Sequence, residues 1–180
     1  SEPYSQGHLE RDNLMRSQLG YRIRSDRHML KVNVLYSKAA VGTQILITED
    51  SDSILVDAGD GTLRDLVDRR FEFETLKAVL LTHEHFDHIS GLYSLVNFLT
   101  LLGRNERLLI TTPRPSVRVQ ALLHPPFMYY SPQFPIPILE MSGEDEERIG
   151  LFRIRGFEVS HAETSTLGYS ILDDDGHRIV

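Results

Sequence analysis

The chain has 180 residues, of which 41% are hydrophobic and 25% charged, and its formal net charge at pH 7 is −7. This length and composition suit one globular domain with a buried core, and no apolar stretch is long enough for a membrane-spanning helix. The acidic balance argues against a broad phosphate-binding face, and the lack of cysteine in the sequence excludes disulfides and thiolate-ligated metal sites.

Residues 1–28 are polar, whereas the segment from Met29, "MLKVNVLY", alternates apolar and polar residues as a half-buried strand does. We therefore expect a leader over 1–28 and a domain over 29–180. The change at Met29 resembles a start methionine preceded by an added tag, and the alternative is a native arm with a short helix around Leu9–Leu19. The leader has no hydrophobic signal core, so we do not expect secretion.

The first half of the domain reads as strands followed by alternating strands and helices. Three strands are predicted at Lys31–Tyr36, Thr43–Thr48 and Ser53–Asp57. The glycines of "VDAGDGTLRDLVDRR" allow a sharp turn, and Thr62 or Asp60 can cap a helix that runs through Arg70. The apolar run "KAVLLT" predicts a buried strand, and "ISGLYSLVNFLTLLG" predicts a helix that ends at Gly103.

The second half continues with the strand "RLLITT", after which Pro113 is expected to open a helix, "PRPSVRVQALL". Residues 124–137 contain five prolines and four aromatic residues, which predicts an irregular loop. We favour packing of these aromatic residues onto the domain over a substrate lid or a dimer contact. The segments "GLFRIRGFEVSH", "LGYSILD" and "HRIV" predict antiparallel strands. This order predicts an α+β fold with two sheets flanked by helices. Four arginines are expected on an ordinary solvent-exposed surface: Arg104, Arg107, Arg114 and Arg118.

The stretch "LTHEHFDHISGL" places His83, His85, Asp87 and His88 directly after a predicted buried strand. An extended segment that turns into a helix can direct the first two side chains at one point and the next two at a neighbouring point. Imidazole and carboxylate groups are the ligands for zinc, manganese or iron where thiolates are lacking. Without a metal, these groups would lose solvation for no gain. A chance cluster on a surface loop is the alternative, and the strand–turn–helix context favours the metal site.

Other polar residues near this stretch have simpler interpretations. Asp57 either orients a ligand histidine or caps its own turn, and the sequence leaves both roles open. Glu84 and Glu163 lie beside ligand-type residues but are expected to face solvent. His124 and His177 have no partner at ligand spacing and are expected on the surface.

The motif "THEHFDH" resembles the H-x-H-x-D-H motif of the metallo-β-lactamase superfamily. Two further segments resemble the family's first and third motifs, "VDAGDGT" and "VSHAETSTLGYSI", and the resemblance runs from about Lys31 to Val180. It implies an αββα sandwich with the site between the two sheets. The implied ligands are His83, His85 and His161 for one metal, and Asp87 and His88 for a second.

The details of the motifs resemble one branch of this superfamily. A histidine directly after Asp87 disfavours the secreted zinc β-lactamases, and the setting of His161 differs from that in glyoxalase II. That setting resembles ribonuclease Z and the related cyclic-nucleotide and phosphonate-pathway phosphodiesterases. However, Phe86 stands where ribonuclease Z usually has glycine. We therefore favour a phosphodiesterase in general over tRNA 3′ processing in particular.

The resemblance implies a metal-dependent hydrolase with two zinc ions per complete site, or manganese or iron in their place. Asp87 would bind metal and orient a hydroxide that attacks phosphorus. The implied substrate is a phosphodiester, either RNA or a cyclic nucleotide. The alternatives are a thioester or lactone hydrolase of the same superfamily, and a non-catalytic subunit that lacks the second metal site. We also expect a homodimer in the cytoplasm, with no membrane association.

One departure from the family concerns the second metal. The family's bridging aspartate and its last histidine would be expected beyond Val180, and the aspartates 173–175 lie in a turn from which they could not bridge two metals. We therefore expect only the N-terminal and middle portions of the sandwich, either as a truncated piece or as a chain completed by another. Such a chain is expected to bind at most one metal tightly and could be inactive on its own.

Overall fold

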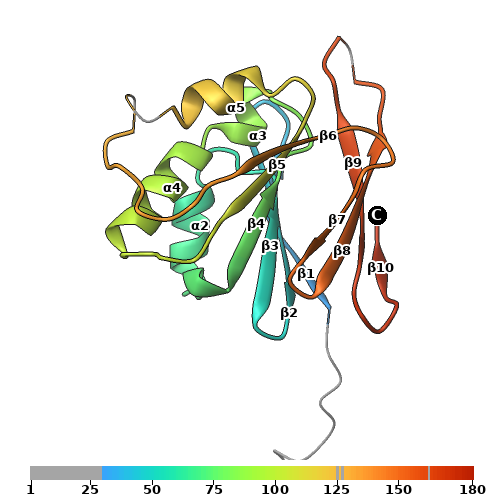
Figure 1. Cartoon of the computed structure of the whole chain (residues 1–180), viewed down its shortest axis with the longest axis horizontal. Helices are drawn as coiled ribbons and strands as arrows, with labels where there is room; N and C mark the ends of the chain where they lie inside the picture. Colours follow the sequence, from blue (N-terminus) through green and yellow to red (C-terminus); the bar gives the residue numbers. More distant parts are fainter. Residues whose placement is uncertain (1–29, 125, 127, 162) are drawn as a thin grey trace, which may run out of the picture.

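The computed structural model describes residues 30–180 apart from 125, 127 and 162, so the predicted leader lies outside the described residues. The described part forms three layers, which are a set of helices, a six-stranded sheet and a four-stranded sheet (Figure 1). None of the described helices combines the length and the apolar character needed to cross a bilayer.

The larger sheet contains the site-bearing strands. In spatial order its strands are β1 (Lys31–Lys38), β2 (Gly42–Glu49), β3 (Asp52–Val56), β4 (Leu76–Leu80), β5 (Leu109–Pro113) and β6 (Ile138–Met141). The pairs β1–β2 and β2–β3 are antiparallel, whereas β3, β4, β5 and β6 run parallel to one another. The parallel strands β3, β4 and β5 therefore end at the same edge of the sheet.

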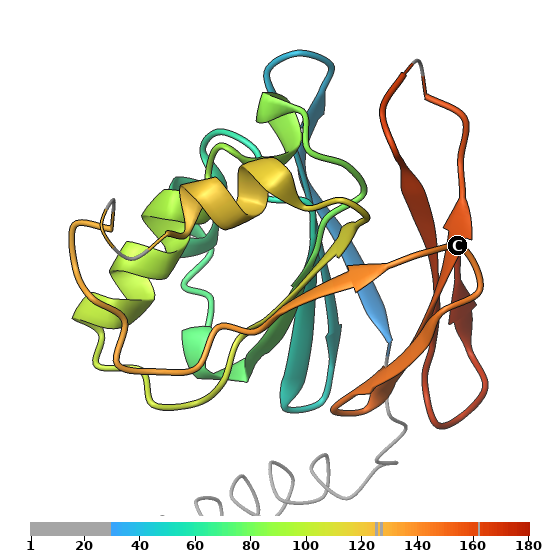
Figure 2. The ribbon, with the colours of Figure 1, turned by 45° about the horizontal axis from the view of Figure 1, so that its top comes forward.

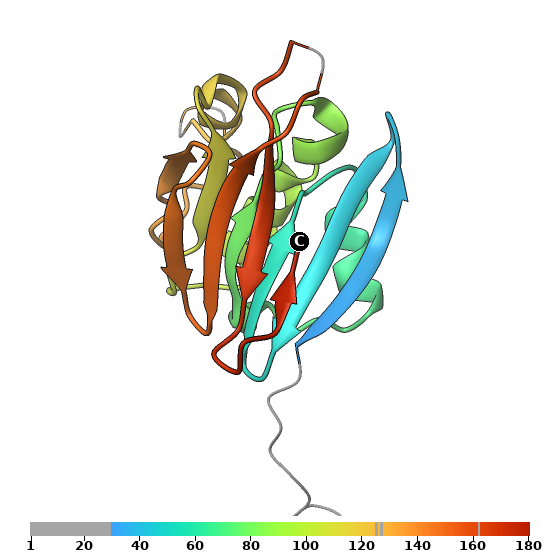
Figure 3. The same ribbon diagram turned by 90° about the vertical axis from the view of Figure 1, so that its right-hand side faces the viewer.

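The smaller sheet is antiparallel and consists of β7 (Glu146–Ile149), β8 (Phe152–Glu158), β9 (Leu167–Leu172) and β10 (Arg178–Ile179), in the order β10-β9-β8-β7. The helices are α2 (Thr62–Asp68), the 3₁₀ turn η1 (Phe73–Thr75), α3 (Phe86–Ile89), α4 (Leu92–Leu101) and α5 (Val117–Leu122). They cover one face of the larger sheet (Figures 1 and 2). Among the described residues no helix covers the outer face of the smaller sheet (Figure 3). These are three of the four layers of the expected αββα sandwich.

Strand β4 shows how the sequence builds two cores. Val79 packs into the core between the helices and the larger sheet, whereas Ala78 and Leu80 pack into the core between the two sheets. Successive side chains of a strand point to opposite faces, so a strand buried on both faces needs apolar residues at every position. This explains why "KAVLLT" has no alternating polar residues.

Several local expectations were wrong. Pro113 does not open a helix; it is the buried last residue of β5, where the loss of its N–H costs little, and α5 begins at Val117. Neither Thr62 nor Asp60 caps α2, whose N-cap is Gly61. The Thr62 hydroxyl instead donates to the Gly59 carbonyl at 2.7 Å. The strands β6 and β7 were not predicted, because four residues with partial exposure give no clear pattern.

The irregular loop and the arginines are partly as expected. Phe134 is buried in the core beneath the helices, while Tyr129 is 78% exposed. Phe127 lies outside the described residues. Arg107, Arg114 and Arg118 are exposed, but Arg104 is only 1% exposed. The expectation of a solvent-exposed Arg104 was therefore wrong.

Candidate metal centre

The predicted motifs meet at the edge where the parallel strands end. Asp57 directly follows β3, and residues 82–88 follow β4. The carboxyl ends of parallel strands are where ligand sites form in open sheets, because loops diverge there. The loop between β8 and β9, which carries His161, reaches the same end of the molecule (Figures 2 and 3).

The glycine turn after β3 holds the histidine motif by backbone contacts. The Ala58 N–H donates to the His88 carbonyl at 2.7 Å, and the Gly91 N–H donates to the Ala58 carbonyl at 2.8 Å. A Cβ atom on Gly59 would lie 2.2 Å from the Asp87 carbonyl oxygen. Only glycine permits this approach, so "DAGDG" fixes the position of the segment that follows β4.

The smaller sheet is hydrogen-bonded to the segment that follows β4. The Leu167 N–H at the start of β9 donates to the Thr82 carbonyl at 2.9 Å. The buried Tyr169 hydroxyl donates to the Leu81 carbonyl at 2.7 Å. Burial raises the pKa of Tyr169 well above its usual value, so the phenol keeps this proton. These two bonds set the loop that carries His161 against the end of β4.

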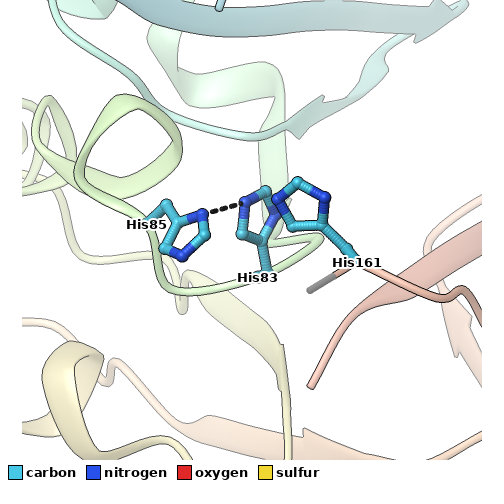
Figure 4. Close-up of side chains that lie close together, drawn as sticks. All are labelled: His83, His85 and His161. Atoms are coloured by element: carbon cyan, nitrogen blue, oxygen red, sulfur yellow. Dashed lines mark hydrogen bonds between the residues drawn. The ribbon is translucent and has the colours of Figure 1, made fainter. Parts of the chain in front are cut away.

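His83, His85 and His161 converge. They offer ring nitrogens that all lie within 4.8 Å of one another, and the three side chains are close together in Figure 4. The ring centroids are 4.6 Å apart for His83–His85, 4.8 Å for His83–His161 and 5.3 Å for His85–His161. Three imidazoles arranged in this way form a donor set for a divalent transition metal.

The hydrogen bonds around His83 leave one of its ring nitrogens available to bind a metal. The Thr82 hydroxyl lies 3.0 Å from His83 Nδ1 and 3.0 Å from both carboxylate oxygens of Asp57. Because an ionised carboxylate only accepts, the hydroxyl donates to Asp57 and can accept from His83 Nδ1–H. The lone pair of His83 then lies on Nε2, which faces His85 Nδ1 at 3.0 Å.

Burial, together with the neighbouring His88, His85 and His161, lowers the pKa of His83 to about 4. The imidazole is therefore neutral at neutral pH, as a metal ligand must be.

Of the two roles that the sequence left open for Asp57, the structure shows the contact with a predicted ligand histidine. One carboxylate oxygen accepts the Thr82 N–H at 2.8 Å, from the segment after β4 and not from its own turn, and the other lies 2.7 Å from His88 Nδ1. Burial disfavours the charged form of His88, but the hydrogen bond to Asp57 and the charges of Asp57 and Asp87 together outweigh it and raise the pKa of His88. Asp57 itself is buried and has a φ of 59°, a conformation that few non-glycine residues adopt. It orients the His88 ring.

Asp87 and His88 form a pair beside the three histidines. The Asp87 carboxylate accepts the Ala40 N–H at 2.8 Å and lies 3.6 Å from His88 Nε2. The His88 ring is 4.0 Å from the His83 ring between centroids. The five predicted ligands are thus gathered in one place, as a set of three and a pair. That the pair binds a second metal stays a prediction. The turn between β9 and β10, with its aspartates, lies at the opposite end of the smaller sheet (Figure 3).

Two threonines contact the histidines and were not foreseen. Thr82 bridges Asp57 and His83, as described above, and Thr164 Oγ1 lies 3.1 Å from His85 Nε2. The position of Thr82 next to the motif is a sequence signal that could have been used. Thr164 gives no such signal, because it reaches His85 across 79 positions of sequence.

Glu84 is not solvent-facing, so that expectation was wrong. Its side chain is buried and accepts the backbone N–H groups of Arg118 at 3.1 Å and Val119 at 2.8 Å, at the start of α5. These donors have no partners within the helix, and a carboxylate there also complements the helix dipole. Glu84 therefore anchors the segment between His83 and His85 to α5. Glu163, His124 and His177 are exposed, as expected.

Replacing Glu84 by alanine should destabilise the fold by about 1–2 kcal/mol, the usual cost of removing a helix cap. It should also weaken metal binding at the three histidines by about 10-fold or more, because losing a residue that orients ligands commonly costs that much. Thermal unfolding and metal titration of the same samples measure both effects. Glu163→Ala removes a nearby but exposed carboxylate and serves as the control. If Glu84→Ala and Glu163→Ala behave alike, Glu84 does not position the ligands.

The match to known proteins agrees with this geometry. Residues 39–180 match the family described as the metallo-beta-lactamase superfamily. The chain is 32% identical over 133 residues to a ribonuclease Z from Gemmatimonas aurantiaca and 35% identical over 132 residues to one from Pyrococcus horikoshii. Each alignment covers 73% of this chain, and 41% and 42% of the respective relative. The chain thus spans about two fifths of the length of these curated relatives.

Solved structures give the same fold. The metallo-beta-lactamase fold protein YhfI from Bacillus subtilis matches with a TM-score of 0.66 and 23% identity, over 84% of this chain and 61% of that one. The short form of human tRNase Z also matches with a TM-score of 0.66, at 19% identity, over 82% of this chain and 66% of that one. At these identities the likeness concerns the fold alone.

Proposed function

The chain belongs to the metallo-beta-lactamase superfamily, and we propose that it carries the ligand-bearing part of a zinc-dependent phosphodiesterase of the ribonuclease Z type. The observation that carries the proposal is that ring nitrogens of His83, His85 and His161 lie within 4.8 Å of one another at the strand ends. The superfamily implies divalent metal ions, and the curated relatives are ribonucleases Z.

The three histidines fit zinc by the chemistry of their donors, and the distance between His83 and His85 fits it as well. Two nitrogens bound to one tetrahedral zinc at about 2.0–2.1 Å would be roughly 3.3 Å apart. His83 Nε2 and His85 Nδ1 are 3.0 Å apart. Thr82 and Asp57 hold His83 in the required tautomer, and Thr164 contacts the far nitrogen of His85. Three protein ligands leave one position for water or substrate, which is the pattern of catalytic zinc sites.

A bound zinc would lower the pKa of a water toward about 7 and offset negative charge on the phosphoryl oxygens. The remaining roles belong to the chain's own residues. Asp87 is held by the Ala40 N–H and lies beside the three histidines, so we assign it to orient the attacking water. His88, whose ring contacts Asp57, would supply with Asp87 two of the ligands of a second metal.

The proposed substrate is a phosphodiester, either RNA or a cyclic nucleotide. Support for RNA comes from the relatives at 32% and 35% identity, which are ribonucleases Z. A diphosphate is a different class of substrate, and one solved structure with a similar fold supports it. That structure is described as a new diphosphatase from the PhnP family, and it matches with a TM-score of 0.60 and 17% identity. That likeness concerns the fold, so the phosphodiester remains the proposal.

Zinc-loaded protein should hydrolyse bis(p-nitrophenyl) phosphate, and this activity should exceed its activity on a thioester and on a lactone under the same conditions. The reason is that the three histidines would hold a zinc ion, which would supply an activated water, and that the relatives at 32% and 35% identity are ribonucleases Z. Release of p-nitrophenol at matched substrate concentrations measures the first activity. His83→Ala, which removes one ligand, is the matched control and should be inactive.

Two results would count against this function. Metal-stripped protein that retains full phosphodiesterase activity would show that the histidines do not act through a metal. Dominant thioesterase or lactonase activity would place the chain with other hydrolases of the superfamily.

A further inference from the structure

A second feature adjoins the histidines on the side of His85. A cleft of about 660 Å³ is lined by Glu84, His85, Phe86, Ile89, Ser90, Arg118, Ala121 and Leu122. Its lining is mostly apolar, and its volume lies within the range of pockets that bind small ligands. His85 forms both part of this cleft and part of the metal centre, so the two are continuous.

Phe86 is the unusual residue of the cleft. Its side chain is 63% exposed, although it lies between two predicted metal ligands. Large apolar side chains are normally buried, and an exposed aromatic ring beside a concave apolar surface marks a binding surface. It is also the residue that departs from the glycine usual in ribonuclease Z, so its presence needs an explanation in this chain.

Arg118 gives the cleft a charge. Its backbone N–H is fixed by Glu84, but none of the described residues forms an ion pair with its guanidinium. An apolar floor, an exposed aromatic ring and one cation that has no ion-pair partner among the described residues suit a ligand that combines a planar apolar group with a negative charge. A nucleotide has this composition, since its base stacks on aromatic rings and its phosphate pairs with arginine.

We propose that the cleft binds the nucleotide next to the scissile phosphodiester, with the base stacked on Phe86 and the adjoining phosphate paired with Arg118. This assignment rests on the proposed phosphodiesterase function and names the part of the substrate that lies on the His85 side. It makes Phe86 a binding residue and gives the site a preference for substrates with a base at this position.

Binding to metal-free protein tests the assignment without any need for hydrolysis. The probe is a dinucleotide that contains 2-aminopurine, whose fluorescence is quenched when the base stacks. Phe86→Ala should weaken its binding at least about fivefold and abolish the quenching, the lower end of the range for one stacked base. Phe86→Trp, which keeps an aromatic ring, should bind at least as well as the parent chain. Val117→Ala removes an exposed apolar side chain that does not line the cleft and should have no effect.

Arg118→Gln tests the charged half of the assignment. It should reduce the slope of log affinity against log salt concentration by about 0.7, the value for one contact with a single-strand phosphate. Circular dichroism and thermal unfolding verify that each variant is folded.

Three outcomes would overturn the assignment. The first is dinucleotide binding that is unaffected by Phe86→Ala. The second is a Val117→Ala variant that loses as much dinucleotide affinity as Phe86→Ala. The third is a parent chain that dimerises through this face and becomes monomeric in Phe86→Ala. Failure of the proposed function is a separate result. Dinucleotide binding that depends on Phe86, together with no hydrolysis by zinc-loaded protein, would keep the nucleotide site and reject phosphodiesterase activity of this chain.

Discussion

Replacing His83 or His161 by alanine is expected to abolish tight zinc binding, whereas His88→Ala should leave it largely intact. The three converging histidines provide one site with three nitrogen ligands, and removing any of them leaves too few to hold the ion. Each loss should cost more than about 100-fold in affinity, since even residues that only orient ligands contribute about 10–100-fold. His88 bonds to Asp57 and lies next to the three histidines without being one of them, so its loss should cost less than about tenfold.

Calorimetric titration of the 180-residue chain with zinc measures both affinity and stoichiometry. We expect one tight equivalent per chain, because Asp87 and His88 supply only two ligands to the other position. His177→Ala is the matched control, since this exposed histidine follows the turn at the opposite end of the smaller sheet. Two tight equivalents, or a His88→Ala variant that binds as poorly as His83→Ala, would show that the ligands are divided differently.

The second large effect concerns Arg104, far from the site. Its guanidinium donates to four backbone carbonyls: Phe73 at 2.9 Å, Leu76 at 2.7 Å, Glu106 at 2.8 Å and Arg107 at 3.1 Å. Burial lowers its pKa, but arginine stays protonated in proteins. It thereby ties the starts of β4 and β5 to the end of α4.

Arg104→Met should destabilise the protein by about 3 kcal/mol or more, because it leaves several buried carbonyls without donors at about 1–3 kcal/mol each. For a chain of this size the melting temperature should fall by roughly 6–12 °C. Arg104→Lys should recover only part of this, since an ammonium cannot reproduce the planar arrangement of donors. Thermal and urea unfolding measure the change.

Arg107→Ala provides the comparison for Arg104, because Arg107 is a neighbouring but exposed arginine. Its effect should stay within about 0.5 kcal/mol. Zinc affinity well below the melting temperature should be the same in Arg104→Met as in the parent chain, because Arg104 lies at the opposite ends of the strands from the histidines. If Arg104→Met lowers the free energy of unfolding by less than about 1 kcal/mol, water satisfies the backbone carbonyls that Arg104 contacts.

The candidate site was largely predictable because its determinants are local. The spacing of His83, His85, Asp87 and His88 is typical of a strand end that turns into a helix. The glycines after Asp57 predict the turn whose backbone contacts this segment. His161 was reached only through the family resemblance, since nothing in its own neighbourhood indicates a ligand. The structure places it within 4.8 Å of the other two.

The residues that sequence reasoning missed act over long distances in the chain. Glu84 was expected in solvent because an extended segment alternates its side chains, but α5, 34 positions away, offers it free backbone donors. Arg104 was expected on the surface because charged residues usually are, yet backbone carbonyls up to 31 positions away enclose it. Such partners become visible only when the fold brings the segments together.

The central claim is that His83, His85 and His161 together bind one zinc ion. X-ray absorption spectroscopy of the chain loaded with one equivalent of zinc tests it most directly, because the spectrum counts imidazole ligands. The expected result is three imidazole nitrogens at about 2.0–2.1 Å and one oxygen. A coordination shell with one imidazole or two, completed by carboxylate oxygens, would contradict it.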